Sequence, residues 1–152
     1  MQGRQQKYWA FLANPKIYNI EKAIQQEEDS WTTKRSKVRA GDRAIIWKAK
    51  GKDQHRGIVA LAEVLTDPIP AKARNGWQYW VDQQKANEQV DRVQVRYYVP
   101  SILPLWDDRT DVPILKELTA FRATGGSVFR VTADQWDTLM EIVGGWPGST
   151  PK

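Results

Sequence analysis

Hydrophobic and polar positions change over at short intervals along this chain, which predicts many short strands and few helices. Apolar runs and strict alternations, both typical of strands, occupy residues 6–13, 43–49, 56–65, 92–99 and 127–131. Helical spacing of apolar residues occupies 20–28, 112–121 and the segment that follows a capping box at 132–135. The pattern therefore predicts a mainly β protein of the α+β class, with a small, strongly curved sheet or pseudo-barrel and flanking helices.

Two stretches show no regular spacing of hydrophobic residues, and we predict that they are irregular. Residues 29–41 form a polar and basic connection with only two large apolar residues, Trp31 among them. Residues 70–87 are less regular still. The chain shows no internal repeat, low-complexity tract or linker, so a second domain is not expected. We expect one domain over residues 1–152, with its core at about 7–143.

Charge is concentrated in one part of the chain. The formal net charge is +5, and the nine basic and two acidic residues between positions 34 and 56 carry +7, so the remainder carries −2. A concentrated basic excess is typical of proteins that bind polyanions such as nucleic acid, although a solvated lysine-rich face has the same signature.

The absence of cysteine excludes disulfides, thiolate catalysis and cysteine-bound metals, and it fits a reducing interior. The first seven residues lack the apolar core of a signal peptide, and no apolar run is long enough to cross a bilayer. We therefore expect a soluble, cytoplasmic protein that does not bind membranes.

Titratable residues do not converge on a catalytic site at the level of sequence. The single histidine, His55, lies in a predicted hairpin with only Asp53 nearby, which is too few ligands for a metal. The acidic pair Asp107 and Asp108 is typical of a solvated loop, and the glycines at 125–126 lack the lysine of a phosphate loop. We therefore predict a binding protein and not an enzyme, with no cofactor, no metal and no catalytic residues.

Tryptophan is unusually abundant, with eight residues in 152. An indole ring packs well in a hydrophobic core, and it also stacks on a base or binds a cation through a cation–π contact. Trp9 and Trp136 lie on apolar faces of predicted elements, so we expect them in the core. We expect Trp106 to pack under a loop and Trp146 to pack as a lid near the chain end.

Trp31 differs because it is predicted to lie in a polar loop, directly before a basic run. Stacking on an aromatic ring contributes about 1–3 kcal/mol per base, so two rings would offset the few kcal/mol needed to take a base out of a duplex. From the residues alone, a base cage and a core position both remain open for Trp31. A core or lid position is favoured for Trp47, Trp77 and Trp80.

Several motifs resemble those of the EVE domain family, in the same order along the chain. They are YWAFLANPK at 8–16, DSWT at 29–32, GDRAIIWKA at 41–49, RGIVA at 56–60 and GGSVF at 125–129. The resemblance covers about residues 7–143. It implies a PUA-like curved barrel related to the YTH readers of methylated adenine in RNA. It also implies a reader of modified bases, often modified cytosine in DNA, that is not an enzyme.

The resemblance further implies positions for a base-binding pocket. Trp31 with Thr32 would supply one aromatic wall, Asn14 the polar edge, and Trp77 or Trp80 the second wall. A strand–hairpin–strand segment would form the floor, with contributions from Trp47, Lys48, Ala49 and Gly57. Phosphates of neighbouring nucleotides would be held by Lys34, Arg35, Lys37 and Arg39.

The resulting hypothesis is a non-catalytic module that holds one flipped or unpaired base of DNA or RNA, modified for example as methylated cytosine. It predicts that substitution of Trp31 costs binding more than folding. Two other functions stay open. One is an aromatic cage for a methylated lysine or another cation, which a basic rim would disfavour. The other is a PUA-like hydrolase acting on a base or nucleotide, which a buried Asp29 or Glu63 beside Trp31 with a raised pKa would support.

Overall fold

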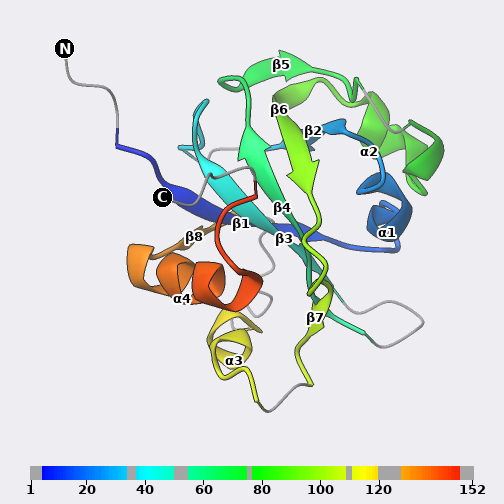
Figure 1. Ribbon diagram of the computed structural model, residues 1–152. Coiled ribbons are helices and arrows are strands. Elements are labelled where there is room, and N and C mark those ends of the chain that lie inside the picture. Colours follow the sequence, from blue (N-terminus) through cyan, green and yellow to red (C-terminus); the bar gives the residue numbers. More distant parts are fainter. Residues whose placement is uncertain are drawn as a thin grey trace.

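The computed structural model describes residues 5–33, 37–49, 55–74, 77–108, 111–119 and 128–147. These residues form one curled, half-barrel sheet with short helices around it (Figure 1). Its strands are β1 Tyr8–Ala13, β2 Glu28–Thr32, β3 Arg43–Lys48, β4 Gly57–Val64, β5 Ile69–Ala71, β6 Val90–Tyr98, β7 Leu105–Trp106 and β8 Val128–Val131. The strand order is β2-β6-β4-β3-β1-β8, and β5 and β7 extend the sheet by pairing with β6 and β4.

The central strands are buried on both faces. β3 (RAIIWK) and β4 (GIVALAEV) are near-continuous apolar runs, as expected for strands covered from both sides. Phe11 and Ile46 belong to a core cluster on one face of the sheet, and Ile45 and Trp47 belong to a second cluster on the other. β1 and β3 run parallel, whereas the other paired strands run antiparallel.

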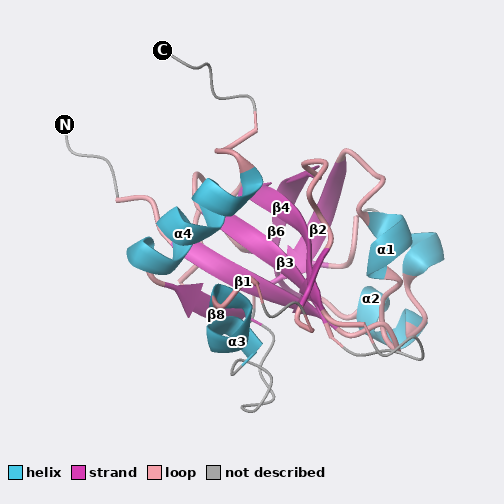
Figure 2. Ribbon diagram, turned by 60° about the horizontal axis from the view of Figure 1, so that its bottom comes forward, coloured by secondary structure: helices cyan, strands magenta, loops and turns pink. Residues whose placement is uncertain are grey.

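The helices gather at two ends of the sheet. α1 Ile20–Ala23, the 3-10 helix η1 Trp77–Tyr79 and α2 Gln83–Asn87 lie at one end, and α3 Ile114–Thr119 and α4 Ala133–Val143 lie at the other (Figure 2). Across the described part of the chain, none of these helices has the length and apolar content needed to span a bilayer.

Most of the predicted elements are confirmed. The five predicted strands correspond to β1, β3, β4, β6 and β8 with ends within two residues. The final helix is confirmed together with its capping box, since the Thr132 side chain accepts from the Gln135 N–H and the Gln135 side chain accepts from the Thr132 N–H. Trp9 and Trp136 are core residues, 5% and 2% exposed.

Other local predictions are wrong. The helix predicted at 20–28 ends at Ala23, after one turn, and Glu28–Thr32 forms strand β2 where a polar connection is predicted. This segment has a single large apolar side chain, and it is a strand because β6 pairs with it, beginning with Glu28 opposite Arg96. The stretch 70–87, predicted to be irregular, contains most of β5 together with η1 and α2. The local spacing of hydrophobic residues does not reveal these elements, because β5 forms by pairing with β6, and η1 and α2 are only three and five residues long.

Candidate functional site

A cavity of about 430 Å³ lies where the carboxyl ends of the parallel strands β1 and β3 meet β2 and α2. Its volume falls within the roughly 300–1,000 Å³ that small-molecule pockets have. Ala13 ends β1 and Ala49 follows β3, and the Ala49 N–H donates to the Ala13 carbonyl at 2.8 Å. The cavity is lined by Leu12, Ala13, Asn14, Ile17, Tyr18, Ser30, Trp31, Thr32, Ala49, Trp80, Lys85, Glu88 and Val90.

The turn that follows β1 brings Tyr18 to the cavity. The Asn14 carbonyl accepts from the N–H groups of Ile17 and Tyr18, both at 2.9 Å. The Asn14 side-chain oxygen accepts from the Lys16 N–H, also at 2.9 Å. An asparagine that bonds the backbone two residues later is typical of an Asx-turn. The sequence Asn-Pro-Lys therefore reverses the chain and places three residues of the turn, Asn14, Ile17 and Tyr18, on the cavity lining.

Three aromatic side chains from separate segments wall the cavity: Tyr18, Trp31 and Trp80. The ring centroid of Tyr18 lies 6.4 Å from that of Trp31, with the planes at 85°, and 4.7 Å from that of Trp80, at 48°. Trp31 also packs against Phe11, with ring centroids 5.5 Å apart. Aromatic rings that converge in this way offer π faces to a planar or a cationic ligand.

A buried carboxylate connects two of these walls. Asp29 is 0% exposed, and its Oδ2 accepts hydrogen bonds from the hydroxyls of Tyr18 and Tyr97, each at 2.6 Å. Its Oδ1 accepts from the Ser30 N–H at 2.8 Å, and the Trp31 indole N–H donates to the Tyr97 hydroxyl at 2.6 Å. Burial raises the pKa of Asp29 from 3.8 to about 6, against the opposing effect of its hydrogen-bond donors.

A buried arginine joins the elements around the cavity. Arg92 is 3% exposed and donates to the Ala71 carbonyl, to the Thr32 hydroxyl and to the carbonyls of Lys85 and Glu88. These four bonds link β5, β2 and α2 through one guanidinium. Among the described residues, the charged side chains on the lining are the basic Lys85 and the acidic Glu88.

Five of the residues proposed for the pocket from sequence line the cavity, namely Asn14, Trp31, Thr32, Ala49 and Trp80. Trp31 reaches it from strand β2 and not from a polar loop, which corrects the prediction of residues 29–41 as a connection. Its side chain is only 9% exposed and belongs to the core cluster. We therefore expect substitution of Trp31 to cost folding as well, contrary to the expectation from sequence.

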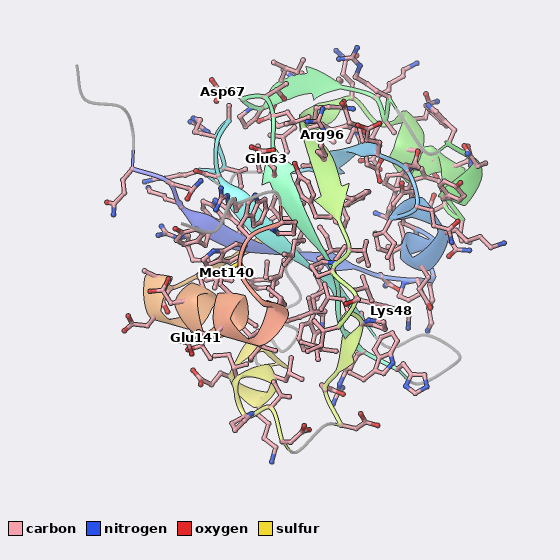
Figure 3. The ribbon with its side chains drawn as sticks, in the orientation of Figure 1. Lys48, Glu63, Asp67, Arg96, Met140 and Glu141 are labelled. Carbon is pink, nitrogen blue, oxygen red and sulfur yellow. The ribbon has the colours of Figure 1, made fainter. Side chains whose placement is uncertain are left out.

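Four of the proposed pocket residues lie elsewhere. Trp47 is 1% exposed and packs in the cluster on the opposite face of the sheet. Lys48 is buried and donates from Nζ to the His55 carbonyl at 2.6 Å, beside β7 (Figure 3). Gly57 packs so closely on β7 that a Cβ there would meet a backbone carbonyl oxygen at 2.0 Å. Trp77, on η1, is 36% exposed and is not among the described residues that line the cavity.

Among the described residues of the basic stretch 34–56, three basic side chains are buried or have internal partners. Arg43 lies over the ring of Trp146, 4.1 Å from the centroid. Arg56 pairs with Asp107. Together with the buried Lys48, these contacts mean that the sequence window overstates the charge available to one ligand.

The proposed phosphate contacts divide into two groups. Lys34 and Arg35 lie outside the described residues. Lys37 and Arg39 are exposed and precede β3, whereas Ala49, on the cavity lining, follows it. A six-residue strand spans about 20 Å, so Lys37 and Arg39 lie at the far end of β3 from Ala49.

Sequence reasoning missed Tyr18, Lys85 and Arg92. The Asn14-Pro15 turn was the available signal for Tyr18, because a tight turn after a strand returns the chain to the end of that strand. Arg92 lies on the polar face of a well-alternating strand, where solvent exposure is the natural expectation. Its burial depends on β5 and α2, which local pattern does not predict.

Asp29 has the two properties that the hydrolase interpretation required, namely burial and a raised pKa. Both of its oxygens nevertheless accept hydrogen bonds from the protein, and Asp29 is not among the described residues that line the cavity. Glu63 is partly buried and accepts from the Tyr98 hydroxyl at 3.2 Å. Neither carboxylate is placed to act on a molecule in the cavity.

The model of the EVE domain matches residues 7–142 of the chain. The chain belongs to the EVE domain family. No curated protein sequence matches it significantly.

Solved structures share its fold at low sequence identity. A hypothetical protein from Leishmania major has a TM-score of 0.62 at 17% identity, covering 92% of this chain and 96% of its own. A protein from Rhodopseudomonas palustris has a TM-score of 0.60 at 20% identity, covering 91% and 93%. The human THYN1 protein, solved in complex with 5-methylcytosine containing DNA, has a TM-score of 0.54 at 13% identity, covering 93% and 100%. The PUA-like α+β fold expected from the sequence is thereby confirmed.

Proposed function

We propose that this EVE-domain protein is a non-catalytic nucleic-acid-binding module that takes one flipped or unpaired, modified base into the cavity. The observation that carries the proposal is the cavity of about 430 Å³ walled by Tyr18, Trp31 and Trp80. A base presents two flat π faces, and aromatic rings from separate segments suit them. The human THYN1 neighbour is bound to 5-methylcytosine containing DNA, which supports this ligand class.

The lining residues divide the recognition between stacking and hydrogen bonding. In this proposal Trp31 and Trp80 contact the base faces, and Asn14 bonds its polar edge. The Thr32 hydroxyl accepts from Arg92 and keeps its own O–H for an acceptor on the base. The Ala49 N–H already donates to Ala13, so side chains and not this amide carry the edge contacts.

The phosphates require cations at the cavity margin. Lys85 lines the cavity, and Lys34 and Arg35 follow Thr32 closely in the chain. We assign these residues to the phosphates nearest the base. Lys37 and Arg39 are assigned to more distant phosphates of the same strand, because they lie beyond the other end of β3.

Two tryptophans three residues apart provide a matched test. Trp80→Ala removes a cavity wall, whereas Trp77→Ala removes an exposed indole that does not line the cavity. Affinity is measured by fluorescence anisotropy with labelled oligonucleotides, single-stranded and duplex, that contain one 5-methylcytosine or one cytosine. We expect Trp80→Ala to weaken binding of the methylated DNA by roughly ten- to a hundredfold, as removal of one stacking partner implies, and Trp77→Ala to leave it unchanged. Equal effects of the two variants would contradict the cavity as the base site.

The dependence on salt tests the phosphate contacts separately. Alanine at Lys34, Arg35, Lys37 and Arg39 should flatten the slope of log affinity against log salt by roughly one for each phosphate that the protein no longer neutralises. The ratio of affinities for methylated and unmethylated DNA should stay the same. Binding to a trimethyl-lysine peptide without binding to any DNA or RNA probe would instead favour the cation cage.

A further inference from the structure

One buried oxygen atom, Asp29 Oδ2, is hydrogen-bonded to two aromatic walls of the cavity, directly to Tyr18 and through Tyr97 to Trp31. Asp29 Oδ2 accepts directly from the hydroxyl of Tyr18, which follows β1, and from the hydroxyl of Tyr97, on β6. Tyr97 in turn accepts from the indole N–H of Trp31. The chain of bonds Trp31, Tyr97, Asp29 and Tyr18 has a length of 2.6 Å at every step. Short hydrogen bonds to a carboxylate are stronger than neutral ones and fix geometry.

The bonds explain why these rings hold their positions at the cavity margin. Tyr18 and Trp31 both line the cavity, whereas Tyr97 and Asp29 do not line it in the part of the chain that is described. On its cavity side a wall residue has no packing partner, so its orientation is set by ring packing and by hydrogen bonds on its buried side. Hydroxyl and indole N–H groups supply that restraint on the buried side of each ring.

The ionised carboxylate suits this role better than its protonated form. As an anion Asp29 only accepts, which matches the hydroxyls of Tyr18 and Tyr97 and the N–H of Ser30. A proton on Oδ2 would be a donor facing two donors, so one hydroxyl would have to turn away. The groups that act on Asp29 are these two tyrosines, from β6 and the segment before α1, and the guanidinium of Arg92 on β6.

We propose that Asp29 is a positioning residue of the base-binding cavity, whose carboxylate holds the Tyr18 and Trp31 rings at the separation and angle with which they enclose a base. This inference rests on the proposed function for its ligand and on the hydrogen-bonded chain for its mechanism. Asp29 touches no ligand itself. Asp29 contributes to the selectivity for a methylated over an unmethylated base. If the Tyr18 and Trp31 rings lay slightly too far apart, the cavity would contact both bases equally well.

Two neighbouring tyrosines allow the restraint to be removed with a matched control. Tyr97→Phe deletes the hydroxyl that joins Trp31 to Asp29, and Tyr98→Phe deletes a hydroxyl that donates to Glu63 Oε1 at 3.2 Å, away from Asp29. Asp29→Asn is the third variant. All are measured below their unfolding temperatures. We expect Tyr97→Phe and Asp29→Asn to lower the ratio of affinities for 5-methylcytosine and cytosine oligonucleotides by about tenfold, and Tyr98→Phe to leave the ratio unchanged.

A measurement on the free protein separates this inference from the proposed function. The indole N–H resonance of Trp31, assigned with Trp31→Phe, is followed by nitrogen-edited NMR as pH is lowered through about 6, where Asp29 takes up its proton. We expect the resonance to titrate in the wild type and in Tyr98→Phe, and to lose that titration in Asp29→Asn and Tyr97→Phe. If Asp29→Asn does not fold, the wild type and the two tyrosine variants still decide the outcome.

The possible results are distinct. A Trp31 resonance that does not titrate in the wild type, or an unchanged selectivity ratio in folded Tyr97→Phe, overturns the positioning role. Absence of binding to every oligonucleotide overturns the proposed function, while the NMR titration still decides whether Asp29 holds the Trp31 ring. A loss of both affinities in equal proportion, with no change in their ratio, would show that Asp29 only supports the fold.

Discussion

Asp29 makes the stability of this protein depend on pH in an unusual direction. Its folded-state pKa is about 6 because burial disfavours the ionised form, against 3.8 for an exposed aspartate. Below about pH 3 the carboxyl is protonated in both the folded and the unfolded chain, so its contribution to stability is fully present. Between about pH 4 and pH 6 the unfolded chain releases this proton while the folded protein retains it, and the contribution is lost as pH rises through about 6, where the folded protein comes to hold a buried anion. The difference in pKa corresponds to about 3 kcal/mol of stability lost from this group between about pH 3 and about pH 7.

The perturbation that isolates this effect is Asp29→Asn, which has no proton to exchange. Free energies of unfolding are measured by urea denaturation for both proteins at intervals from about pH 3 to about pH 7. Other carboxylates titrate equally in the two proteins, so the difference between them reports Asp29 alone. We expect the stability of the wild type relative to Asp29→Asn to fall by about 3 kcal/mol over this range. A difference that stays constant, or that rises with pH, would refute the reasoning, because the tyrosine hydrogen bonds would then outweigh burial.

Three further substitutions test how the fold is held around the site. Trp31→Ala should lower the free energy of unfolding by about 3–5 kcal/mol in urea denaturation, since the indole is 9% exposed in the core, and a change below 1 kcal/mol would contradict its structural role. Gly57→Ala should cost about 1–3 kcal/mol or more, because its Cβ would meet the Leu105 carbonyl oxygen at 2.0 Å, and an unchanged melting temperature would be inconsistent with this contact. Thr132→Ala should cost about 1 kcal/mol through loss of the α4 capping box, and Thr132→Ser should restore most of it in the same thermal unfolding assay.

The local pattern predicts well those strands whose own residues indicate how deeply they are buried and where they end. β3 and β4 are apolar along almost their whole length, and β1 ends at an Asn-Pro turn. The final helix has both halves of its capping box within four residues. In each case the interactions that determine the element are local or depend only on burial. The spacing of hydrophobic residues along the chain is therefore sufficient to predict the element.

β2 shows the opposite situation. Its sequence EDSWT is polar enough to resemble a loop, and it becomes a strand through pairing with residues of β6 that lie at least 60 positions later. The burial of Asp29 follows from the same pairing, because the hydroxyl of Tyr97 reaches it from β6. A polar residue is stable in the interior only when distant groups satisfy it, and those groups are not visible in a local window.

The sequence alone determined the family, the fold class, the core strands and part of the cavity lining, since Asn14, Trp31, Thr32, Ala49 and Trp80 all lie at one cavity. Only the tertiary structure decided that Trp47, Lys48, Gly57 and Trp77 lie elsewhere, and that Tyr18 and Lys85 join the lining. The physical reason is that periodicity reports whether a side chain is buried and not which face of a curled sheet buries it. Strand order and register make that choice, and they arise from contacts between segments far apart in the chain.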